Sequence, residues 1–336
     1  MFYLHLIHYI GFFGAQIFNS ILALLIIKRA GKLFGSYRHA MLVFTLCSML
    51  LSWVEILAQP VLYMKGPMFV VFVDHSSLPM MVRDLLPALH CGTFGFLIAV
   101  LAAQFFYRYL ALCKTHLLHH FNGSRILLIF LPPLLIYILW FSVVDWGMSA
   151  TPQKREYLRE DLKLFYDADS MTVPFIAPLY WEVTGEKVWR FKDVLSAGIC
   201  SLIIMLLSTS ILFFGLNIYL HMKNSSAHMS QRTLELNRQL FIMLIVQTLI
   251  PFITMYIPVG LFIVLPFFNA TLGKYVNYPS VSITMYPMIE PLIAMCAISD
   301  FRKTIKKLIR KGARVAVMPE NYAMTTNVSE SKTIVN

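Results

Sequence analysis

Seven long apolar stretches occupy most of this 336-residue chain and limit what it can fold into. A helix that crosses a hydrocarbon core of about 30 Å needs about 20 apolar residues, because each residue adds about 1.5 Å. In lipid an unpaired backbone amide costs several kcal/mol, so such segments must be helices rather than open strands. The sequence therefore predicts an all-α membrane protein, a bundle of seven transmembrane helices. The expected spans are residues 4–27, 40–64, 85–113, 126–148, 194–220, 240–266 and 276–299.

The charged residues between the spans predict an orientation. The chain carries a net charge of +11, which could indicate a nucleic-acid-binding protein. With the N-terminus outside, however, the cytoplasmic segments contain eighteen Lys and Arg residues against four acids, whereas the outer segments contain ten of each. This distribution follows the positive-inside rule. We therefore expect an outer N-terminus, an inner C-terminus, contact with membrane lipid and no nucleic-acid partner.

The residues outside the seven spans predict the domain organisation. Residues 1–311 are expected to form one seven-helix domain that ends in an amphipathic helix over about residues 300–311. Gly312 is placed to end this helix, and residues 312–336 are expected to form a disordered cytoplasmic tail. The amphipathic helix has five basic residues around an apolar face, which is typical of a helix lying on anionic lipid. That face consists of Phe301, Ile305, Leu308 and Ile309.

No arrangement typical of an enzyme active site occurs in the sequence. There is no Ser-His-Asp order, no H-E-x-x-H pair and no Walker glycine loop. Four residues could be arranged as metal ligands, but in a short basic loop they favour a solvated surface. These residues are Cys113, His116, His119 and His120. We therefore expect no enzyme activity, no catalytic residue, no cofactor and no metal site.

The cysteines and one glycosylation motif leave three points open. All five cysteines lie within or at the ends of spans, where buried free thiols are expected. A Cys91–Cys200 bridge and palmitoylation of Cys113 stay open as alternatives. Asn269 is an N-x-T site expected on the outer side but very close to the membrane, so its glycosylation stays open as well.

Polar residues inside the spans are costly in lipid and are expected to face the interior of the bundle. Counted from the inner ends of the spans, four of them lie about 11–14 Å deep and so form one layer. They either join the helices by hydrogen bonds or form a network that rearranges when a ligand binds. This layer consists of Asn19, Ser48, Gln247 and Glu290, with Gln104 one turn above Arg108.

Prolines near the middle of several spans predict kinks, because each removes a backbone hydrogen bond. Kinks in the sixth and seventh spans are natural hinges between an outer pocket and the inner face. The prolines are Pro60 in the second span, Pro132 and Pro133 in the fourth, Pro251 and Pro258 in the sixth, and Pro287 and Pro291 in the seventh.

An outer pocket bounded by spans two, three, five, six and seven is expected from depth alone. Glu55 lies in the outer third of its span, about 23 Å from the inner end, with His90 as its nearest polar neighbour by depth. It is either a ligand contact or a proton-bearing acid. His90 and Tyr256 are the preferred neutral anchors for a ligand. The candidate ligand-binding residues are Glu55, His90, Thr93, Phe94, Cys200, Tyr256, Ser282 and Tyr286.

Four segments of the chain carry a family resemblance. The longest is RQLFIMLIVQTLIPFITMYIPVGLFIVLPFFN, which is followed by MYPMIEPLIAMCAISDFRKTI. The others are FNSILALLIIKRAGKLFGSYRHAM near the start and FFYRYLALCK at the end of the third span. Over about Gly11 to Ile309, the chain resembles the Str class of nematode seven-transmembrane chemoreceptors, which includes odorant receptors of ciliated sensory neurons.

The resemblance implies a G-protein-coupled receptor that binds a small-molecule odorant and activates a heterotrimeric G protein on the cytoplasmic face. It also implies a multi-pass protein of the plasma membrane, in the ciliary membrane of chemosensory neurons. The triplet Tyr107, Arg108 and Tyr109 stands where rhodopsin-like receptors have D-R-Y, so Arg108 has no neighbouring acid to pair with.

Two positions depart from the class. Gln104 stands where many members have His, and Glu290 stands where the class usually has Asp before Pro291. Both substitutions keep a polar side chain, so the implied fold is unaffected. We expect G-protein coupling to depend on the Tyr107–Tyr109 triplet and on the inner polar layer together with Pro291.

Two other functions stay open at this stage. One is a ligand-gated channel or transporter with a seven-helix body, although the spans show no ring of acids and no obvious inverted repeat. The other is a scaffold or trafficking protein with a receptor-like body. The ligand, the G-protein α subunit and the oligomeric state are not determined by the sequence.

Overall fold

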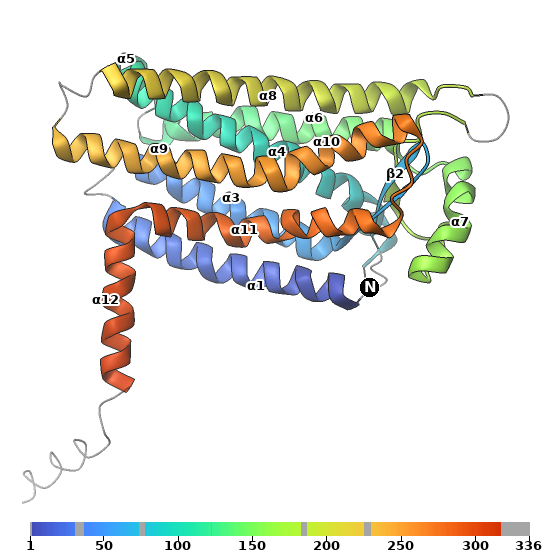
Figure 1. The fold of residues 1–336 in the computed structure, drawn as a ribbon, viewed down its shortest axis with the longest axis horizontal. Coiled ribbons are helices and arrows are strands. Elements are labelled where there is room, and N and C mark those ends of the chain that lie inside the picture. The colour runs from blue at the N-terminus through green and yellow to red at the C-terminus, as the bar shows by residue number, and fades with distance from the viewer. Residues whose placement is uncertain are drawn as a thin grey trace, which may run out of the picture.

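The computed structural model describes residues 2–30, 37–73, 78–121, 123–182, 187–224 and 230–316. Within these ranges, seven helices long and apolar enough to cross a membrane run side by side as one bundle (Figure 1). The predicted fold class, a seven-helix membrane bundle, is confirmed. The span helices are α1 (Phe2–Leu25) with its π-helical extension η1 (Ile26–Ala30), α3 (Tyr37–Ala58), α4 (Met80–Cys113), α6 (Leu131–Met148), α8 (Phe191–Asn224), α9 (Gln231–Pro251) and α11 (Asn277–Ala297).

Shorter helical segments extend or join these spans. The sixth span continues beyond α9 as a π-helical turn, η5 (Phe252–Tyr256), and then as α10 (Ile257–Val264). The fourth span begins with a 3₁₀ segment, η3 (Gly123–Phe130), so that Pro132 and Pro133 lie in the first turn of α6 rather than inside it. The remaining short segments are α5 (Thr115–Leu118), η2 (His119–Phe121), η6 (Leu265–Phe268) and η7 (Lys274–Val276).

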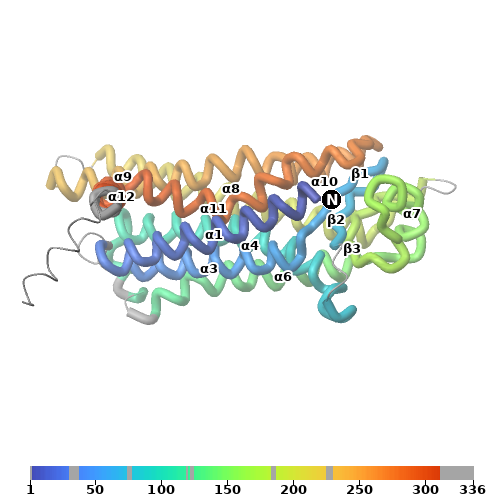
Figure 2. The backbone as a smooth tube through the Cα atoms, turned by 90° about the horizontal axis from the view of Figure 1, so that it is seen from below, coloured from blue at the N-terminus to red at the C-terminus, as the bar shows by residue number. Residues whose placement is uncertain are grey.

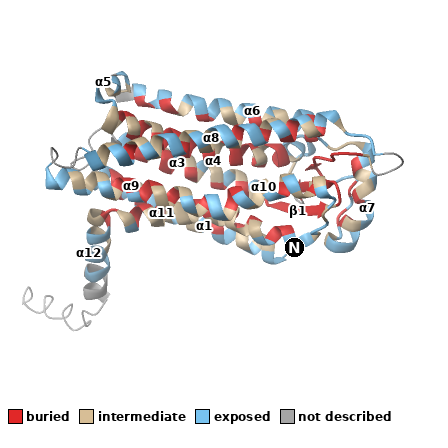
Figure 3. Ribbon diagram, turned by 45° about the horizontal axis from the view of Figure 1, so that its top comes forward, coloured by how far each residue is buried: buried red, intermediate tan, exposed pale blue. Residues whose placement is uncertain are grey.

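Helix α4 runs through the centre of the bundle. Buried residues concentrate along it and on the helix faces around it, while the outer faces of the other helices are exposed, as suits a surface that meets lipid (Figure 3). The close approach of α6 depends on glycine, because a Cβ atom at Gly95 would lie 2.6 Å from the Trp140 ring. A Cβ atom at Gly11 of α1 would likewise lie 2.8 Å from the Thr284 carbonyl oxygen of α11.

A three-stranded antiparallel sheet covers one end of the bundle, which we call the sheet end (Figure 2). Strands β1 (Pro60–Lys65) and β2 (Met68–Val73) form a hairpin, and β3 (Phe175–Ile176) pairs with β2, which gives the order β1-β2-β3. The hairpin turns at Gly66, whose φ of +52° suits glycine. Helix α7 (Pro152–Tyr166) packs over the outer side of this sheet.

Several predicted boundaries differ from the structure, and two of the differences change an element at the end of a span. The second span was expected to reach residue 64, but α3 ends at Ala58, Gln59 has a φ of +40°, and the chain continues as β1. Residues 60–64 are as apolar as the helix before them, and hydrophobicity alone does not separate a buried strand from a helix. Pro60 therefore begins a strand instead of kinking a span.

The helix after the seventh span is also longer than expected. Helix α12 (Ser299–Ala316) turns away from the bundle at the end opposite the sheet, and it continues through Gly312 instead of ending there (Figure 1). Phe301 is buried against the bundle, whereas Leu308 and Ile309 are exposed. The predicted tail from residue 317 onward lies outside the described residues.

Candidate ligand-binding cavity

A cavity of about 90 Å³ lies beneath the sheet, in the end of the bundle that the sheet covers. Its volume is several times the ~10–15 Å³ that a single water needs. The walls come from α3, α4, α6, α8, α10 and α11, and the roof comes from β1, β2 and β3. The apolar lining consists of Pro60, Leu62, Phe69, Val71, Phe94, Trp140, Val144, Met148, Ile176, Pro178, Val259, Ile263 and Ile283.

A buried acid, Glu55, and the side chains that bind it form the main polar part of the cavity lining, and His8 contacts the acid from outside the lining. The Thr284 hydroxyl donates to Oε1 of Glu55 over 2.8 Å, and Nδ1 of His90 lies 2.9 Å from Oε2. Nδ1 of His8, on α1, lies 3.6 Å from Oε1. Glu55 is only 9% exposed, and a carboxylate in such surroundings needs partners of this kind.

The structure brings five of the eight predicted ligand-binding residues to this cavity. The two on other elements are Glu55 of α3 and Cys200 of α8. The three on α4 are His90, Thr93 and Phe94. All five cysteines are free, so Cys91 and Cys200, which both line the cavity, are not bridged.

The other three predicted residues do not line the cavity. The ring of Tyr256 lies behind the wall and contacts Phe94, with ring centroids 5.1 Å apart. Tyr286 lies deeper in the bundle, and Ser282 is half-buried on a different face of α11. Depth fixes height along a helix but not rotation about its axis. The face of α11 that lines the cavity instead carries Ser280, Ile283 and Thr284, at the spacing of one helical face.

Counting residues along each span also did not predict the strands that cover the cavity. In β2 the side chains of Phe69 and Val71 face the cavity, whereas Val70 and Phe72 pack with α7 residues on the other side of the sheet. This is the alternation of a strand. The sequence of this strand, MFVVFV, nevertheless shows no alternation of polar and apolar residues, because both faces of the strand are buried. The Pro60 that begins β1 was the available signal for a strand.

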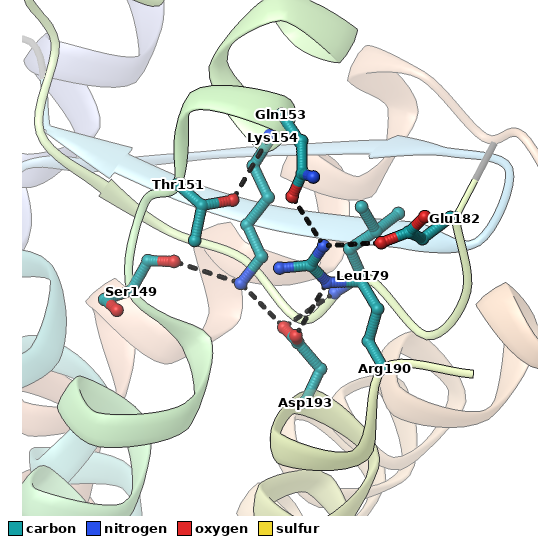
Figure 4. Close-up of polar contacts among 8 residues, drawn as sticks. All are labelled: Ser149, Thr151, Gln153, Lys154, Leu179, Glu182, Arg190 and Asp193. Atoms are coloured by element: carbon teal, nitrogen blue, oxygen red, sulfur yellow. Dashed lines mark hydrogen bonds and ion pairs between the residues drawn. The ribbon is translucent and has the colours of Figure 1, made fainter. Parts of the chain in front are cut away.

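A buried ion pair holds the roof segment that follows β3 (Figure 4). Asp193, in the first turn of α8, accepts a hydrogen bond from the Leu179 backbone N–H at 3.0 Å, and Nζ of Lys154 lies 2.6 Å from its Oδ1. Arg190 Nε donates to the other carboxylate oxygen over 3.2 Å. Lys154 is 1% exposed and also donates to the Ser149 carbonyl oxygen. Burial lowers the pKa of Lys154, and the Asp193 carboxylate opposes that shift.

The inner polar layer is largely gathered in one place. Ser48, Gln104, Gln247 and Glu290 line two adjoining cavities of about 20 and 10 Å³, each of a size for about one water. Asn19 lies apart from them, and its Nδ2 donates to the Pro287 carbonyl oxygen over 2.9 Å.

The position of Asn19 has a physical reason. Pro291 has no N–H, so it leaves the carbonyl of Pro287, four residues earlier, without its helical donor. The amide of Asn19 supplies the missing hydrogen bond from α1. Asn19 therefore joins the first span to the proline-containing seventh span.

The Tyr107–Tyr109 triplet lies at the end opposite the sheet. Arg108 is 5% exposed, and its Nη2 donates to Oδ1 of Asn237 on α9 over 3.1 Å. Tyr107 is buried, and Tyr109 packs on Phe214 of α8 with ring centroids 5.4 Å apart. The third span is thus linked to the fifth and sixth spans at this end.

Comparisons with known proteins agree with this architecture. Residues 4–306 match the family model described as serpentine type 7TM GPCR chemoreceptor Str. The chain is 28% identical to "Serpentine receptor class r-10" of Caenorhabditis briggsae over 94% of this chain and 93% of that protein. It is 26% identical to "G-protein coupled receptor str-33" of Caenorhabditis elegans over 95% of each chain. These relatives are named as receptors rather than enzymes. The chain therefore belongs to the Str family of serpentine seven-transmembrane chemoreceptors.

Proposed function

We propose that this chain is a G-protein-coupled olfactory receptor that binds a small-molecule odorant in the cavity beneath the sheet and activates a heterotrimeric G protein. The observation that carries the proposal is the cavity itself, an apolar chamber with a polar cluster around Glu55. Family membership over residues 4–306 supports the same reading.

The lining indicates the chemistry of the ligand. Apolar walls favour a small lipophilic molecule, and the polar groups can bind one or two of its polar atoms. A ligand with a fixed charge is disfavoured, because the Glu55 carboxylate already has His90 and Thr284 as partners and the rest of the lining cannot solvate an ion. Affinity therefore rests on few polar contacts and on close packing of a small molecule.

The orientation is part of the proposal. The positive-inside distribution favours the sheet end on the outer side, where an odorant arrives. The end that carries Arg108 and α12 then faces the cytoplasm and the G protein, and the basic residues of α12 lie near anionic lipid. We place the receptor in the plasma membrane of chemosensory neurons, in the ciliary membrane.

Calcium imaging of expressing cells against an odorant panel tests the proposal. We expect at least one lipophilic, neutral odorant to raise calcium, and we expect the response to disappear when the G protein is blocked. A response that persists under blockade would instead indicate a ligand-gated channel. Cells without the receptor serve as the control for endogenous responses.

A further inference from the structure

Pro251 leaves one carbonyl of the sixth span without a donor. In an α-helix the N–H of residue 251 would donate to the carbonyl of Gln247, and proline has no N–H. The next amide, that of Phe252, donates to the carbonyls of Thr248 and Leu249 instead. The Gln247 carbonyl therefore receives no hydrogen bond from residue 251, which has no N–H, or from the Phe252 amide, which is directed elsewhere. This is the point where the span changes from α-helix to the π-helical turn η5.

The hydroxyl of Tyr286 takes the place of the missing amide. It comes from α11 and donates to the Gln247 carbonyl oxygen over 3.2 Å. Tyr286 is 2% exposed, so no bulk water reaches this position. A buried carbonyl without a donor is costly, and this hydrogen bond therefore stabilises the sixth span in its interrupted form.

The Gln247 carbonyl lies between the cavity and the Arg108 end. On the cavity side, η5 ends at Tyr256, whose ring contacts Phe94 of the cavity wall. On the other side, Asn237 of α9 accepts a hydrogen bond from Arg108, and it is separated from Gln247 by ten residues, or about 15 Å of helix. A change at η5 would move one of these contacts relative to the other.

We propose that Tyr286 is a positioning residue whose hydroxyl replaces the amide that Pro251 lacks, and that it thereby holds the hinge of the sixth span between the cavity and the Arg108–Asn237 contact. The stabilising effect of this hydrogen bond on the sixth span does not depend on what the protein does. Its role in transmitting a ligand signal rests on the proposed receptor function.

A double-mutant cycle on the purified, ligand-free receptor in lipid nanodiscs tests the hydrogen bond. Tyr286→Phe should lower the melting temperature by about 2–4 °C, because the Gln247 carbonyl loses its donor. Pro251→Ala restores a backbone N–H, so Tyr286→Phe should cost less than half as much on that background. Equal losses on both backgrounds would overturn the proposal.

Tyr256→Phe is the matched control for this cycle. The hydroxyl of Tyr256, which belongs to the sixth span, is also buried but has no hydrogen-bond partner among the described residues. We expect no loss of melting temperature for this variant, since no bond is removed. A loss as large as that of Tyr286→Phe would mean that the assay detects any change to a buried tyrosine, and the proposal would then fail.

Hydrogen exchange decides the case if Pro251→Ala does not fold. Tyr286→Phe should raise the exchange rate of the amides of residues 252–257 several-fold, whereas Tyr256→Phe should leave it within twofold of the parent. Unchanged exchange in Tyr286→Phe would overturn the proposal. A positive result in a receptor that activates no G protein would overturn the role in signalling and the proposed function, while the hydrogen bond would stand.

Discussion

At the scale of single residues, the cavity is defined by which polar atoms reach it. His90 and Thr284 bind the Glu55 carboxylate and also line the cavity, so they can offer a ligand their remaining polar positions. Tyr256, predicted as a second anchor, lies behind Phe94 and does not reach the cavity. The ligand's polar contacts are therefore expected at the Glu55 cluster.

His90→Ala should raise the half-maximal concentration of an odorant by about tenfold or more, because a lost hydrogen bond costs about 1–2 kcal/mol. The measurement is a calcium dose–response curve at matched surface expression. Tyr256→Phe is the control, and its curve should coincide with that of the parent. An unchanged curve for His90→Ala would place the ligand away from the Glu55 cluster.

Arg108→Ala should keep surface expression and ligand binding but lose most G-protein activation. The reason is that Arg108 joins α4 to Asn237 of α9 at the proposed cytoplasmic face. G-protein activation by an identified odorant is the measurement, and Arg125→Ala, at an exposed arginine of the same end, is the control. Normal activation by Arg108→Ala would show that the triplet is not needed for coupling.

At the scale of elements, the roof of the cavity and the helix α7 that packs on it are held in place without a disulfide. The segment between α6 and α8 contains no cysteine, and it is held instead by strand pairing and by the buried Lys154–Asp193 pair. The Leu179 amide bound by Asp193 directly follows Pro178, which lines the cavity. The ion pair thus fixes part of the cavity wall.

Lys154→Met should destabilise the roof by about 3 kcal/mol, because it leaves the buried Asp193 carboxylate without its ammonium partner. Lys163→Met is the matched control on the same helix, since Lys163 pairs with Asp167 in an exposed i,i+4 contact. Thermal unfolding of the purified receptor is the measurement. Equal melting temperatures for the two variants would mean that the buried pair does not hold the roof.

At the scale of the whole molecule, the two ends of the bundle differ in kind. One end is covered by the sheet and α7, and the other carries α12 and the Arg108–Asn237 contact (Figure 1). The proposed function, with ligand entry at one end and G-protein contact at the other, requires these ends to lie on opposite sides of the membrane. The charge distribution predicts which side is which.

Leu164→Cys should react with a membrane-impermeant maleimide on intact cells, because Leu164 is an exposed residue of α7 at the sheet end. Arg232→Cys, exposed at the opposite end, should react only after permeabilisation. The parent protein, with its five native cysteines, gives the background. The reverse pattern of labelling would invert the proposed orientation.

The sequence by itself determined the class of the molecule. Length and hydrophobicity suffice for the seven spans, because a single long apolar segment satisfies its backbone hydrogen bonds in lipid only as a helix. The motifs suffice for the family. Depth along each span also placed Glu55 beside His90 and grouped Ser48, Gln104, Gln247 and Glu290, although Asn19 of the same predicted layer lies apart. These inferences depend on one coordinate, the distance along the membrane normal, which residue counting supplies.

The tertiary structure decided what depends on rotation and on long-range pairing. Helix rotation put Ser280 and Thr284 in the cavity and Ser282 outside it. Pairing between residues far apart in the chain made β1, β2 and β3 a roof, which local hydrophobicity could not distinguish from helix. The donor for the Gln247 carbonyl likewise comes from Tyr286, 39 residues away. A sequence pattern reports local periodicity, whereas each of these contacts is fixed by how separate helices and strands pack together.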